Sequence, residues 1–543
     1  MQYIHLFYVE VKSMPLYNFL WCNKSYKEGK VVYIQKDNLI WIGGGTESVY
    51  ILPSMANRHG LIAGATGTGK TVSLKVMAEA FSDMGVPVFL ADIKGDVASM
   101  CKPGEPNHHV DDRVKDLNIE GFAYKAYPVR LFDVFGEKGV PVRTTISDMG
   151  PELLARIMQL NDTQAGVLNI IFHIADDKGM LLIDVKDLRS MLQYVGDHND
   201  EFQTAYGNVS AQTIGTIQRS LLTLEDSGGD IFFGEPELDM NDWFACNETG
   251  QGILNLLACE KLVQSPLLYS TFLLWMLSTL YEMLPEVGDM DKPKMVFFFD
   301  EAHLLFNNAP KSLLDKVEQV ARLIRSKGVG IYFITQSPSD IPDTVLSQLG
   351  HKIQHALRAY TPSDQKALKA AASSFRVNPA FDTEKTISEL GTGEAVVSVL
   401  DEKGAPTIAQ RVFILPPQSY MGTLDDATIA NMIKGNPLYG KYATTVDNAS
   451  AYEALQKTAE DDKAAAEQAA KEAEEAKQKA IDDKEAAKKE AAEQKAADRK
   501  AERDEIQKEK RAAQRTRDVE RAVGSIGRDV GKQLLRGLFG NRR

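Results

Sequence analysis

The eight residues numbered 64–71 read Gly-Ala-Thr-Gly-Thr-Gly-Lys-Thr, a spacing that suits a chain of phosphates. Glycines allow backbone N–H groups to wrap around phosphate oxygens, and the N-terminus of a following helix adds a partial positive charge. Lys70 would reach the β- and γ-phosphates, and the Thr71 hydroxyl would bind Mg²⁺. The segment therefore predicts a binding site for ATP and Mg²⁺. The alternative is a glycine-rich turn without a ligand.

A second candidate is the run Met-Val-Phe-Phe-Phe-Asp-Glu at 295–301. An apolar strand that ends in Asp-Glu would deliver two carboxylates to the edge of a sheet. Asp300 would hold Mg²⁺ through water, and Glu301 would act as the general base that polarises the attacking water. Alone, the run could equally be a strand that ends in an acidic loop, but its pairing with the 64–71 segment favours the catalytic interpretation.

A third candidate, Gln336, ends the apolar run at 329–335. There its amide could orient the attacking water and sense the γ-phosphate; the alternative is a polar cap at the end of a strand. Arg322 and Arg325 precede the same run and could stabilise charge on the nucleotide of a neighbouring subunit. They could instead belong to a solvated helix face, and Arg358 is a candidate with weaker support.

We expect the following residues to contact nucleotide or metal directly: Gly64, Ala65, Thr66, Gly67, Thr68, Gly69, Lys70, Thr71 and Asp300. Asp92, Lys94 and Asp96 follow another apolar run, at 86–91, where open α/β sheets bind ligands, although they could simply solvate a loop. The histidines at 108, 109 and 303 have no third ligand at a metal-binding spacing, so we expect surface histidines.

The elements that must position these residues are short apolar runs that alternate with helical stretches between residues 51 and 420. The runs lie at 60–63, 86–91, 252–258, 295–299, 329–335 and 395–400. Near-continuous apolar strands separated by helices predict an α/β fold with a mainly parallel sheet that is covered on both faces. Residues 1–50 predict a short β-rich segment, and a helical insertion is expected at about 100–250.

The composition changes after a connector at 421–448. Residues 449–520 are dominated by Ala, Glu, Lys, Gln and Asp, which predicts a long solvated helix or a weak alanine-based coiled coil. Apolar residues recur at helical spacing among basic ones in 521–543, which predicts a basic amphipathic tail. Such a tail could dock on the protein itself or on a partner chain, or contact an anionic membrane or nucleic acid.

Composition limits the class of protein. The 543 residues are 44% hydrophobic and 25% charged, which is typical of a soluble globular chain. The net charge of -13 argues against a globally basic nucleic-acid coat protein but leaves open a basic channel formed in an oligomer. The cysteines at 22, 101, 246 and 259 form no pair, so a reducing cytoplasm is expected. No signal peptide is predicted, and the uncharged segment 262–281 reads as a buried helix rather than a membrane span.

Asp-Glu-Ala-His at 300–303 spells the box of superfamily-2 helicases, but the long separation from residue 71 and the missing arginine-rich final motif argue against that family. The layout instead resembles the HerA–FtsK superfamily of P-loop motors, in its bacterial HerA-like branch typified by YjgR. The segments that carry the resemblance are 53–60, 64–71, 92–96, 297–306, 335–338 and 354–362, and it extends over about 45–540. The first 40 residues differ from the short start of that branch.

The resemblance implies a RecA-like ASCE core that forms a hexamer with ATP at the subunit interfaces. HerA proteins are translocases on double-stranded DNA that partner nucleases, so a helicase-type DNA motor is the first hypothesis. The second hypothesis is an ATP-driven switch or assembly ATPase that acts on a protein partner through the charged tail. ATP hydrolysis is expected in both.

Overall fold

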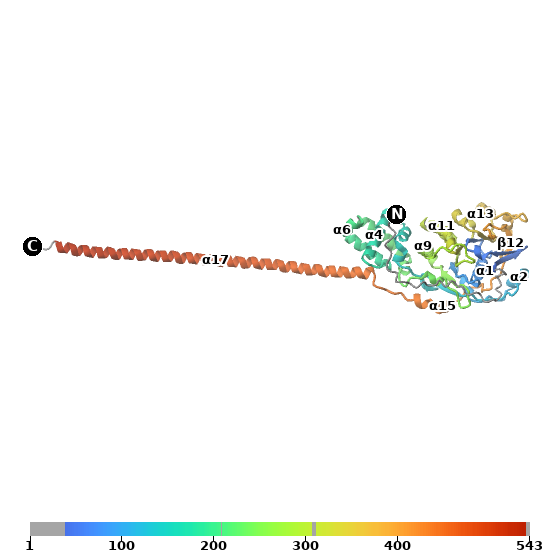
Figure 1. The fold of residues 1–543 in the computed structure, drawn as a ribbon, viewed down its shortest axis with the longest axis horizontal. Helices are drawn as coiled ribbons and strands as arrows, with labels where there is room; N and C mark the ends of the chain where they lie inside the picture. Colours follow the sequence, from blue (N-terminus) through green and yellow to red (C-terminus); the bar gives the residue numbers. More distant parts are fainter. Residues whose placement is uncertain (1–37, 208, 307–310, 539–543) are drawn as a thin grey trace. The chain divides into compact units, whose positions relative to one another are not determined.

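The computed structural model describes residues 38–207, 209–306 and 311–538 (Figure 1). The side chains at 203–205, 312 and 525–538 are not among those described. The chain divides into two compact units, Met1–Leu455 and Gln456–Arg543. Of the predicted β-rich start and its cysteine at position 22, the part before residue 38 lies outside the described residues.

One mixed sheet forms the centre of the larger unit, and the described residues contribute twelve strands to it. Their order is β2 (Ser48–Ile51), β1 (Ile40–Gly45), β12 (Gln410–Ile414), β11 (Glu394–Ser398), β10 (His351–Gln354), β3 (Gly60–Ala63), β9 (Val329–Thr335), β8 (Met295–Phe299), β4 (Val88–Asp92), β7 (Leu254–Ala258), β5 (Val129–Asp133) and β6 (Val140–Pro141). The strands from β10 to β6 are parallel, and the other four pair antiparallel. The predicted α/β fold with a mainly parallel sheet is confirmed.

The central strands are buried along their whole length, as near-continuous apolar runs in a doubly covered parallel sheet require. Alternate residues of β8 and β9 join different hydrophobic clusters: Phe297 and Phe333 belong to one and Phe298 and Ile334 to the other. The run at 395–400 differs from expectation, because it forms β11, which is antiparallel to its neighbours.

Helices cover both faces of the sheet. Helix α1 (Lys70–Asp83) packs in one cluster, and α9 (Pro266–Met283) and α11 (Lys311–Leu323) pack in the other. The uncharged segment 262–281 thus lies largely in a helix whose side chains are mostly buried against the sheet. Among the helices that the structure describes, none has both the length and the apolar character needed to cross a membrane.

Between β6 and β7 the chain forms a group of helices. They are α3 (Ile146–Ile157), α4 (Asp162–Asp177), α5 (Val185–Asp197), α6 (Asn199–Tyr206), α7 (Ala211–Leu224) and α8 (Asp230–Phe232). Capping boxes start two of them, with Asn161 and Gln164 at α4 and Asp184 and Asp187 at α5, which satisfies N–H groups that have no partner inside the helix.

Short helices complete the larger unit. They are α2 (His108–Asp116), α10 (His303–Phe306), α12 (Asp343–Leu346), α13 (Pro362–Ser373), α14 (Thr383–Glu389), α15 (Asp426–Gly435) and α16 (Tyr439–Tyr442).

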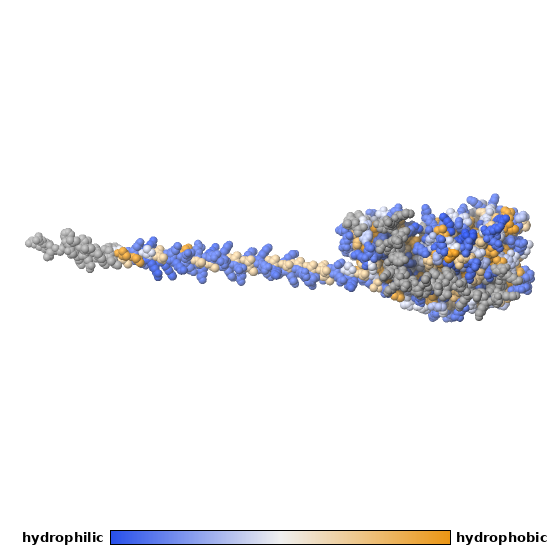
Figure 2. All heavy atoms as spheres, viewed as in Figure 1, coloured by the Kyte–Doolittle hydropathy of each residue, from blue (hydrophilic) through white to orange (hydrophobic). Residues whose placement is uncertain are grey.

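Helix α17 (Ala451–Leu538) begins in the larger unit and forms the second one. Its first turn is fixed by Asp187 of α5, whose Oδ1 accepts hydrogen bonds from Ser450 Oγ at 2.5 Å and Tyr452 N at 2.9 Å. The side chains at 459–524 are exposed, and Figure 2 shows them as mostly hydrophilic. Of the predicted basic tail at 521–543, the backbone is helical to residue 538, and 539–543 lie outside the described residues.

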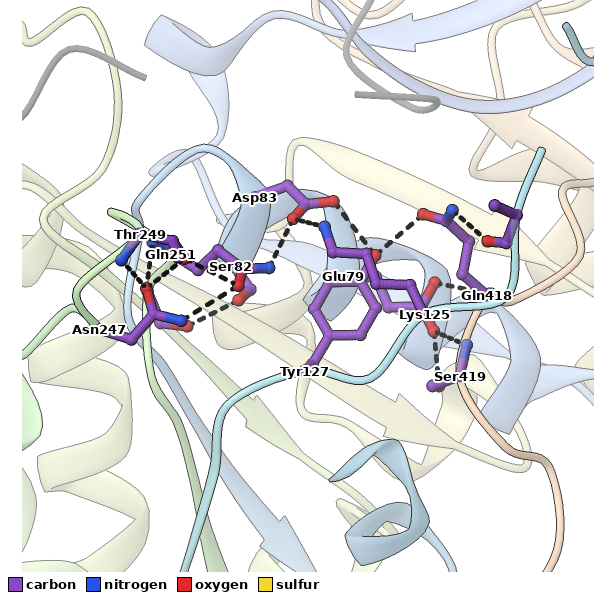
Figure 3. Close-up of polar contacts among 12 residues, drawn as sticks. Glu79, Ser82, Asp83, Lys125, Tyr127, Asn247, Thr249, Gln251, Gln418 and Ser419 are labelled. Carbon is purple, nitrogen blue, oxygen red and sulfur yellow. Dashed lines mark hydrogen bonds and ion pairs between the residues drawn. The ribbon is translucent and has the colours of Figure 1, made fainter. Parts of the chain in front are cut away.

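Helix α1 carries two buried acidic residues, Glu79 and Asp83, toward its C-terminal end, and Figure 3 shows their polar contacts. The Glu79 carboxylate accepts hydrogen bonds from Gln418 N at 2.9 Å, Ser419 N at 3.0 Å and Ser419 Oγ at 2.6 Å. Asp83 pairs with Lys125 and accepts a bond from Gln251 Nε2 at 2.9 Å. The helix is therefore fastened to the segment at 418–419 by bonds that water cannot replace.

Lys75 adds a third contact from the same helix face. Its ammonium donates to Ser99 Oγ at 2.7 Å and to the carbonyl oxygen of Tyr420 at 2.8 Å. Burial lowers the pKa of Lys75, because desolvation disfavours the ammonium. The segment at 418–420 thus receives contacts from both an acidic and a basic side chain of α1.

Replacing Glu79 with Ala should lower the free energy of unfolding of the larger unit by about 2–4 kcal/mol, because three buried donors lose their acceptor. Chemical denaturation followed by circular dichroism measures the change. The matched control is Glu152→Ala on α3, whose side chain is 77% exposed, and its effect should stay below about 0.5 kcal/mol. Equal midpoints for the two variants would contradict the assigned role of Glu79.

Candidate active site

The carboxyl ends of four adjacent parallel strands meet at one edge of the sheet. In sheet order these strands are β3, β9, β8 and β4, and they lead into the 64–71 segment, Gln336, Asp300 and the loop after Asp92. Parallel pairing brings these residues together, although residues 64 and 336 are 272 positions apart in the sequence, because parallel strands end at a common edge.

The 64–71 segment forms a tight loop between β3 and α1. Gly64 and Gly69 have φ angles of 154° and 115°, which favour glycine. The loop is fixed by bonds from Ala65 N to the Ala356 carbonyl at 2.8 Å and from Gly393 N to the Thr68 carbonyl at 2.9 Å. The geometry is that of a preformed cradle of backbone amides at the start of a helix.

Lys70 begins α1 and its ammonium lies over the loop, where it donates to the carbonyl oxygens of Gly64 at 2.6 Å and Ala65 at 3.1 Å. Burial and the charge of Lys94 lower the pKa of Lys70, while Glu301 and Asp300 act in the opposite direction. A desolvated cation in this position is suited to an anionic ligand that brings its own negative charge.

His355 lies directly beneath the loop and was given no role by the sequence. A Cβ atom at Gly64 would come within 2.5 Å of the His355 Cβ, so the two backbones are in close contact. The imidazole Nδ1 bonds the Glu394 carbonyl at 2.8 Å, and Nε2 bonds Ser73 Oγ at 2.8 Å. Because a carbonyl can only accept, Nδ1 carries the proton and Nε2 accepts from the serine. His355 therefore ties the loop and α1 to β11.

Asp300 and Glu301 follow β8 and are both buried, with 6% and 8% of their surface exposed. Burial raises the pKa of Asp300 to about 6, although Lys94 acts in the opposite direction. Glu301 has a φ angle of 45°, a left-handed conformation that is uncommon outside glycine. This backbone turn fixes the direction in which its carboxylate leaves the strand.

Both carboxylate oxygens of Glu301 have neighbours. Oε1 lies 2.7 Å from Lys94 Nζ, while Oε2 accepts a bond from Gln336 Nε2 at 3.4 Å and lies 3.2 Å from His303 Nδ1. Burial alone would raise the pKa of Glu301, but the hydrogen bond and charge of Lys94 outweigh it and lower the pKa. The predicted base, the predicted sensor Gln336 and Lys94 thus form one cluster.

Asp92 has a structural part in this cluster. Its carboxylate accepts bonds from Gly95 N at 2.8 Å and Val97 N at 3.2 Å, which shapes the loop that carries Lys94. Burial, together with the charge of Asp96, raises the pKa of Asp92 to about 7.

The arginines lie elsewhere. Arg322, at the end of α11, and Arg325, in the turn that follows it, precede the amino end of β9, so they lie at the opposite edge of the sheet from the phosphate loop. They line a cavity of about 350 Å³ together with Arg58 and Lys352. Arg358 follows β10 and bonds the carbonyl oxygens of Ser388 and Leu390, the latter at 2.8 Å.

The donors at the loop suit Mg²⁺. The Thr71 hydroxyl, on the half-buried first turn of α1, and the buried Asp300 carboxylate are hard oxygen ligands. A carboxylate with a raised pKa also gains from a nearby cation. Of the predicted surface histidines, His108 and His109 are exposed, with tilted rings whose centres are 3.7 Å apart. His303 instead contacts Glu301.

Sequence reasoning also missed Arg113 of α2. Its Nη1 donates to the carbonyl oxygens of Gly393 and Ile414, each at 3.0 Å, and so holds the 391–393 turn that packs against the phosphate loop. No local motif marks Arg113, and His355 follows β10, whose His-Lys-Ile-Gln sequence lacks the apolar run that would have marked a strand.

Comparisons with known proteins found a matching family model and several related chains. The family model described as "Helicase HerA-like C-terminal" matches residues 38–543. The "DNA double-strand break repair helicase HerA" of Saccharolobus solfataricus is 23% identical over 381 residues, which is 68% of each chain. "Probable helicase MJECL08" of Methanocaldococcus jannaschii is 32% identical over 125 residues, and this chain covers only 22% of its length.

Among solved structures, the bacterial conjugative coupling protein TrwBdeltaN70 is 14% identical with a TM-score of 0.46. The match covers 69% of this chain and 89% of that protein. VirB4 of Thermoanaerobacter pseudethanolicus is 15% identical with a TM-score of 0.46, over 70% of this chain and 97% of that one.

Acid should destabilise the protein through His355. Burial lowers the pKa of His355 from 6.5 to about 4, so between these values the unfolded chain binds a proton that the folded chain does not. Stability should therefore fall as the pH falls from 6.5 to 4, by roughly 2–3 kcal/mol from this residue. Denaturation midpoints at several pH values measure the effect.

His355→Gln should weaken this pH dependence, and the exposed His173→Gln should leave it as in the wild type. Burial also lowers the pKa of His59 and His351. The part of the pH dependence of stability that comes from these two residues should remain in both variants. An unchanged pH dependence in His355→Gln would show that the buried ring does not contribute.

Proposed function

This chain belongs to the HerA-like helicase C-terminal family of P-loop ATPases, and from that premise we propose that it is an ATP-driven motor that translocates along double-stranded DNA as a hexamer. The observation that carries the proposal is the arrangement of charged groups on the sheet. The phosphate loop, Asp300, Glu301 and Gln336 share one edge, and Arg322 and Arg325 lie at the other.

The groups at the first of these edges suit ATP hydrolysis. The backbone amides at 64–69 and Lys70 hold the phosphates of ATP. A water oxygen attacks the γ-phosphorus, its proton passes to the Glu301 carboxylate, and the bond from that phosphorus to the β–γ bridging oxygen breaks. Gln336, which bonds Glu301, orients the water. The Thr71 hydroxyl and the Asp300 carboxylate would hold Mg²⁺, which would neutralise charge on the phosphate oxygens.

The opposite edge supports assembly. Arg322 and Arg325 cannot stabilise charge at the phosphate loop of their own subunit, because they precede β9 and the loop lies at the opposite end of the strands. A ring places that edge of one subunit against the phosphate loop of the next, so that an arginine completes the site and couples neighbouring subunits.

DNA as the substrate is supported by similarity to a DNA double-strand break repair helicase over 68% of the chain. The net charge of -13 belongs to the whole chain, and local cations lining a ring suffice to contact phosphates. A nuclease that processes DNA ends is the corresponding class of partner.

Helix α17 favours a second function. Its side chains are exposed and largely charged, and before residue 500 the basic residues do not outnumber the acidic ones. A long helix of mixed charge suits a protein partner better than nucleic acid. In this case the chain is an ATP-driven switch or assembly ATPase, with the same hydrolysis site.

ATP hydrolysis by the purified chain should rise at least about tenfold with double-stranded DNA, and this stimulation should fade with added salt because phosphate contacts release counterions. Glu301→Gln should bind ATP and reduce the rate by about 100-fold or more, because the water loses its base. A phosphate-release assay and a nucleotide-binding titration measure both.

The effect of DNA on the rate distinguishes the two proposed functions, and the rate of Glu301→Gln tests the role of Glu301. Hydrolysis indifferent to DNA would favour the protein-directed switch. A wild-type rate in Glu301→Gln would remove Glu301 from its role. Lys186→Met is a suitable control, because it removes a half-exposed lysine of α5 that is paired with Asp184, in the group of helices between β6 and β7.

Arg325→Ala should lose most hydrolysis, about 100-fold, and recover part of it when mixed with Lys70→Ala subunits. Each variant then supplies what its neighbour lacks, since one has an intact phosphate loop and the other an intact arginine. Rates of mixed and unmixed samples at equal total concentration test this. Failure of mixing to restore activity would leave Arg325 as a surface charge.

A further inference from the structure

Lys94 occupies an unexpected place for a loop lysine. Its ammonium lies 2.7 Å from Glu301 Oε1, and Gln336 and His303 lie at the other oxygen of the same carboxylate. A carboxylate with a cation at one oxygen and polar neighbours at the other is stabilised in its charged form, which makes it a weaker base toward an attacking water. In this arrangement Glu301 is withheld from the reaction that the proposed function assigns to it.

The backbone around Lys94 is fixed while its side chain is reachable. The bonds from Gly95 N and Val97 N to Asp92 hold the loop, and Gly95 has a φ angle of 72°. The Lys94 side chain is 41% exposed, whereas that of Glu301 is 10% exposed. A ligand can therefore approach the cation from solvent without first moving the carboxylate.

The charges nearby indicate which ligand would approach. The positive charge of Lys94 acts to lower the pKa of Lys70, so the two ammonium groups are near each other. The negative charges of Asp300 and Asp96 act to raise the pKa of Lys94. Lys94 is thus within electrostatic reach of the phosphate loop. An oxyanion that arrives there would compete with Glu301 for the same ammonium.

We propose that Lys94 is a shared cation: it holds Glu301 in an ion pair until a phosphate oxyanion takes over its ammonium, which frees the Glu301 carboxylate to accept the proton of water. This inference rests on the proposed ATPase function and adds its regulation. The oxyanion comes either from the γ-phosphate of ATP or from the phosphodiester backbone of DNA, and the chemistry of recognition is the same. Lys94 is in this sense a positioning residue for Glu301.

A binding cycle tests the proposal without turnover. Wild type, Lys94→Met, Glu301→Gln and the double variant are titrated with ATPγS, with ADP and with a short DNA duplex at fixed salt. Removing the carboxylate frees Lys94, so Glu301→Gln should bind one phosphate ligand at least about threefold more tightly than wild type. The double variant should lose this gain.

The ligands distinguish the source of the oxyanion. A gain for ATPγS and not for ADP identifies the γ-phosphate, and a gain for the duplex identifies the phosphodiester backbone. Lys94→Arg should preserve the gain in the Glu301→Gln background, because a cation remains. The control Lys186→Met, which removes a half-exposed lysine paired with Asp184, should bind like wild type.

The proposal is overturned if the gain persists in the double variant, or if Glu301→Gln binds all three ligands with wild-type affinity. Melting temperatures of the four proteins show that each is folded. Hydrolysis is measured separately: a wild type that binds but does not hydrolyse ATP refutes the proposed function, while the binding cycle still reports on Lys94.

Discussion

Parallel pairing of β3, β9, β8 and β4 is the constraint on which the site depends. Each strand of a parallel sheet points the same way, so every strand delivers its following loop to one edge and receives its preceding loop at the other. The loop that binds phosphate, the acidic pair and the glutamine therefore need no special folding to meet. The same rule places Arg322 and Arg325, which precede the amino end of β9, at the opposite edge of the sheet.

Desolvation then sets the chemistry. The carboxyl groups at this edge lie among apolar strands, and burial raises the pKa of Asp92 and Asp300. Glu301 differs because Lys94 is paired with it, and its pKa falls. Three acidic side chains within one small region thus have different electrostatic states, one shaping a loop, one suited to a metal ion and one paired with a lysine.

The sequence predicted those strands and loops that a local residue pattern determines. Apolar runs at 60–63, 295–299 and 329–335 coincide with β3, β8 and β9, and the phosphate loop was evident from its spacing. Strand β10, with His-Lys-Ile-Gln, has too few apolar residues to be recognised, so His355 beyond it was missed. The Lys94–Glu301 contact joins residues far apart in the chain, and only the order of strands β4 and β8 reveals it. The direction of β11 is likewise decided by its neighbours.

Helix α1 contacts the phosphate loop at its first residue and the segment at 418–420 farther along its length. Its first residue lies on the phosphate loop, and Lys75 and Glu79 hold the segment at 418–420. Fourteen residues of α-helix make a rod about 20 Å long, which bends little under load. Since parting the buried Glu79 from its donors would cost those hydrogen bonds, we expect α1 and the segment at 418–420 to keep their relative position. The segment that leads into α15 is thus fixed to the same helix that begins at the phosphate loop.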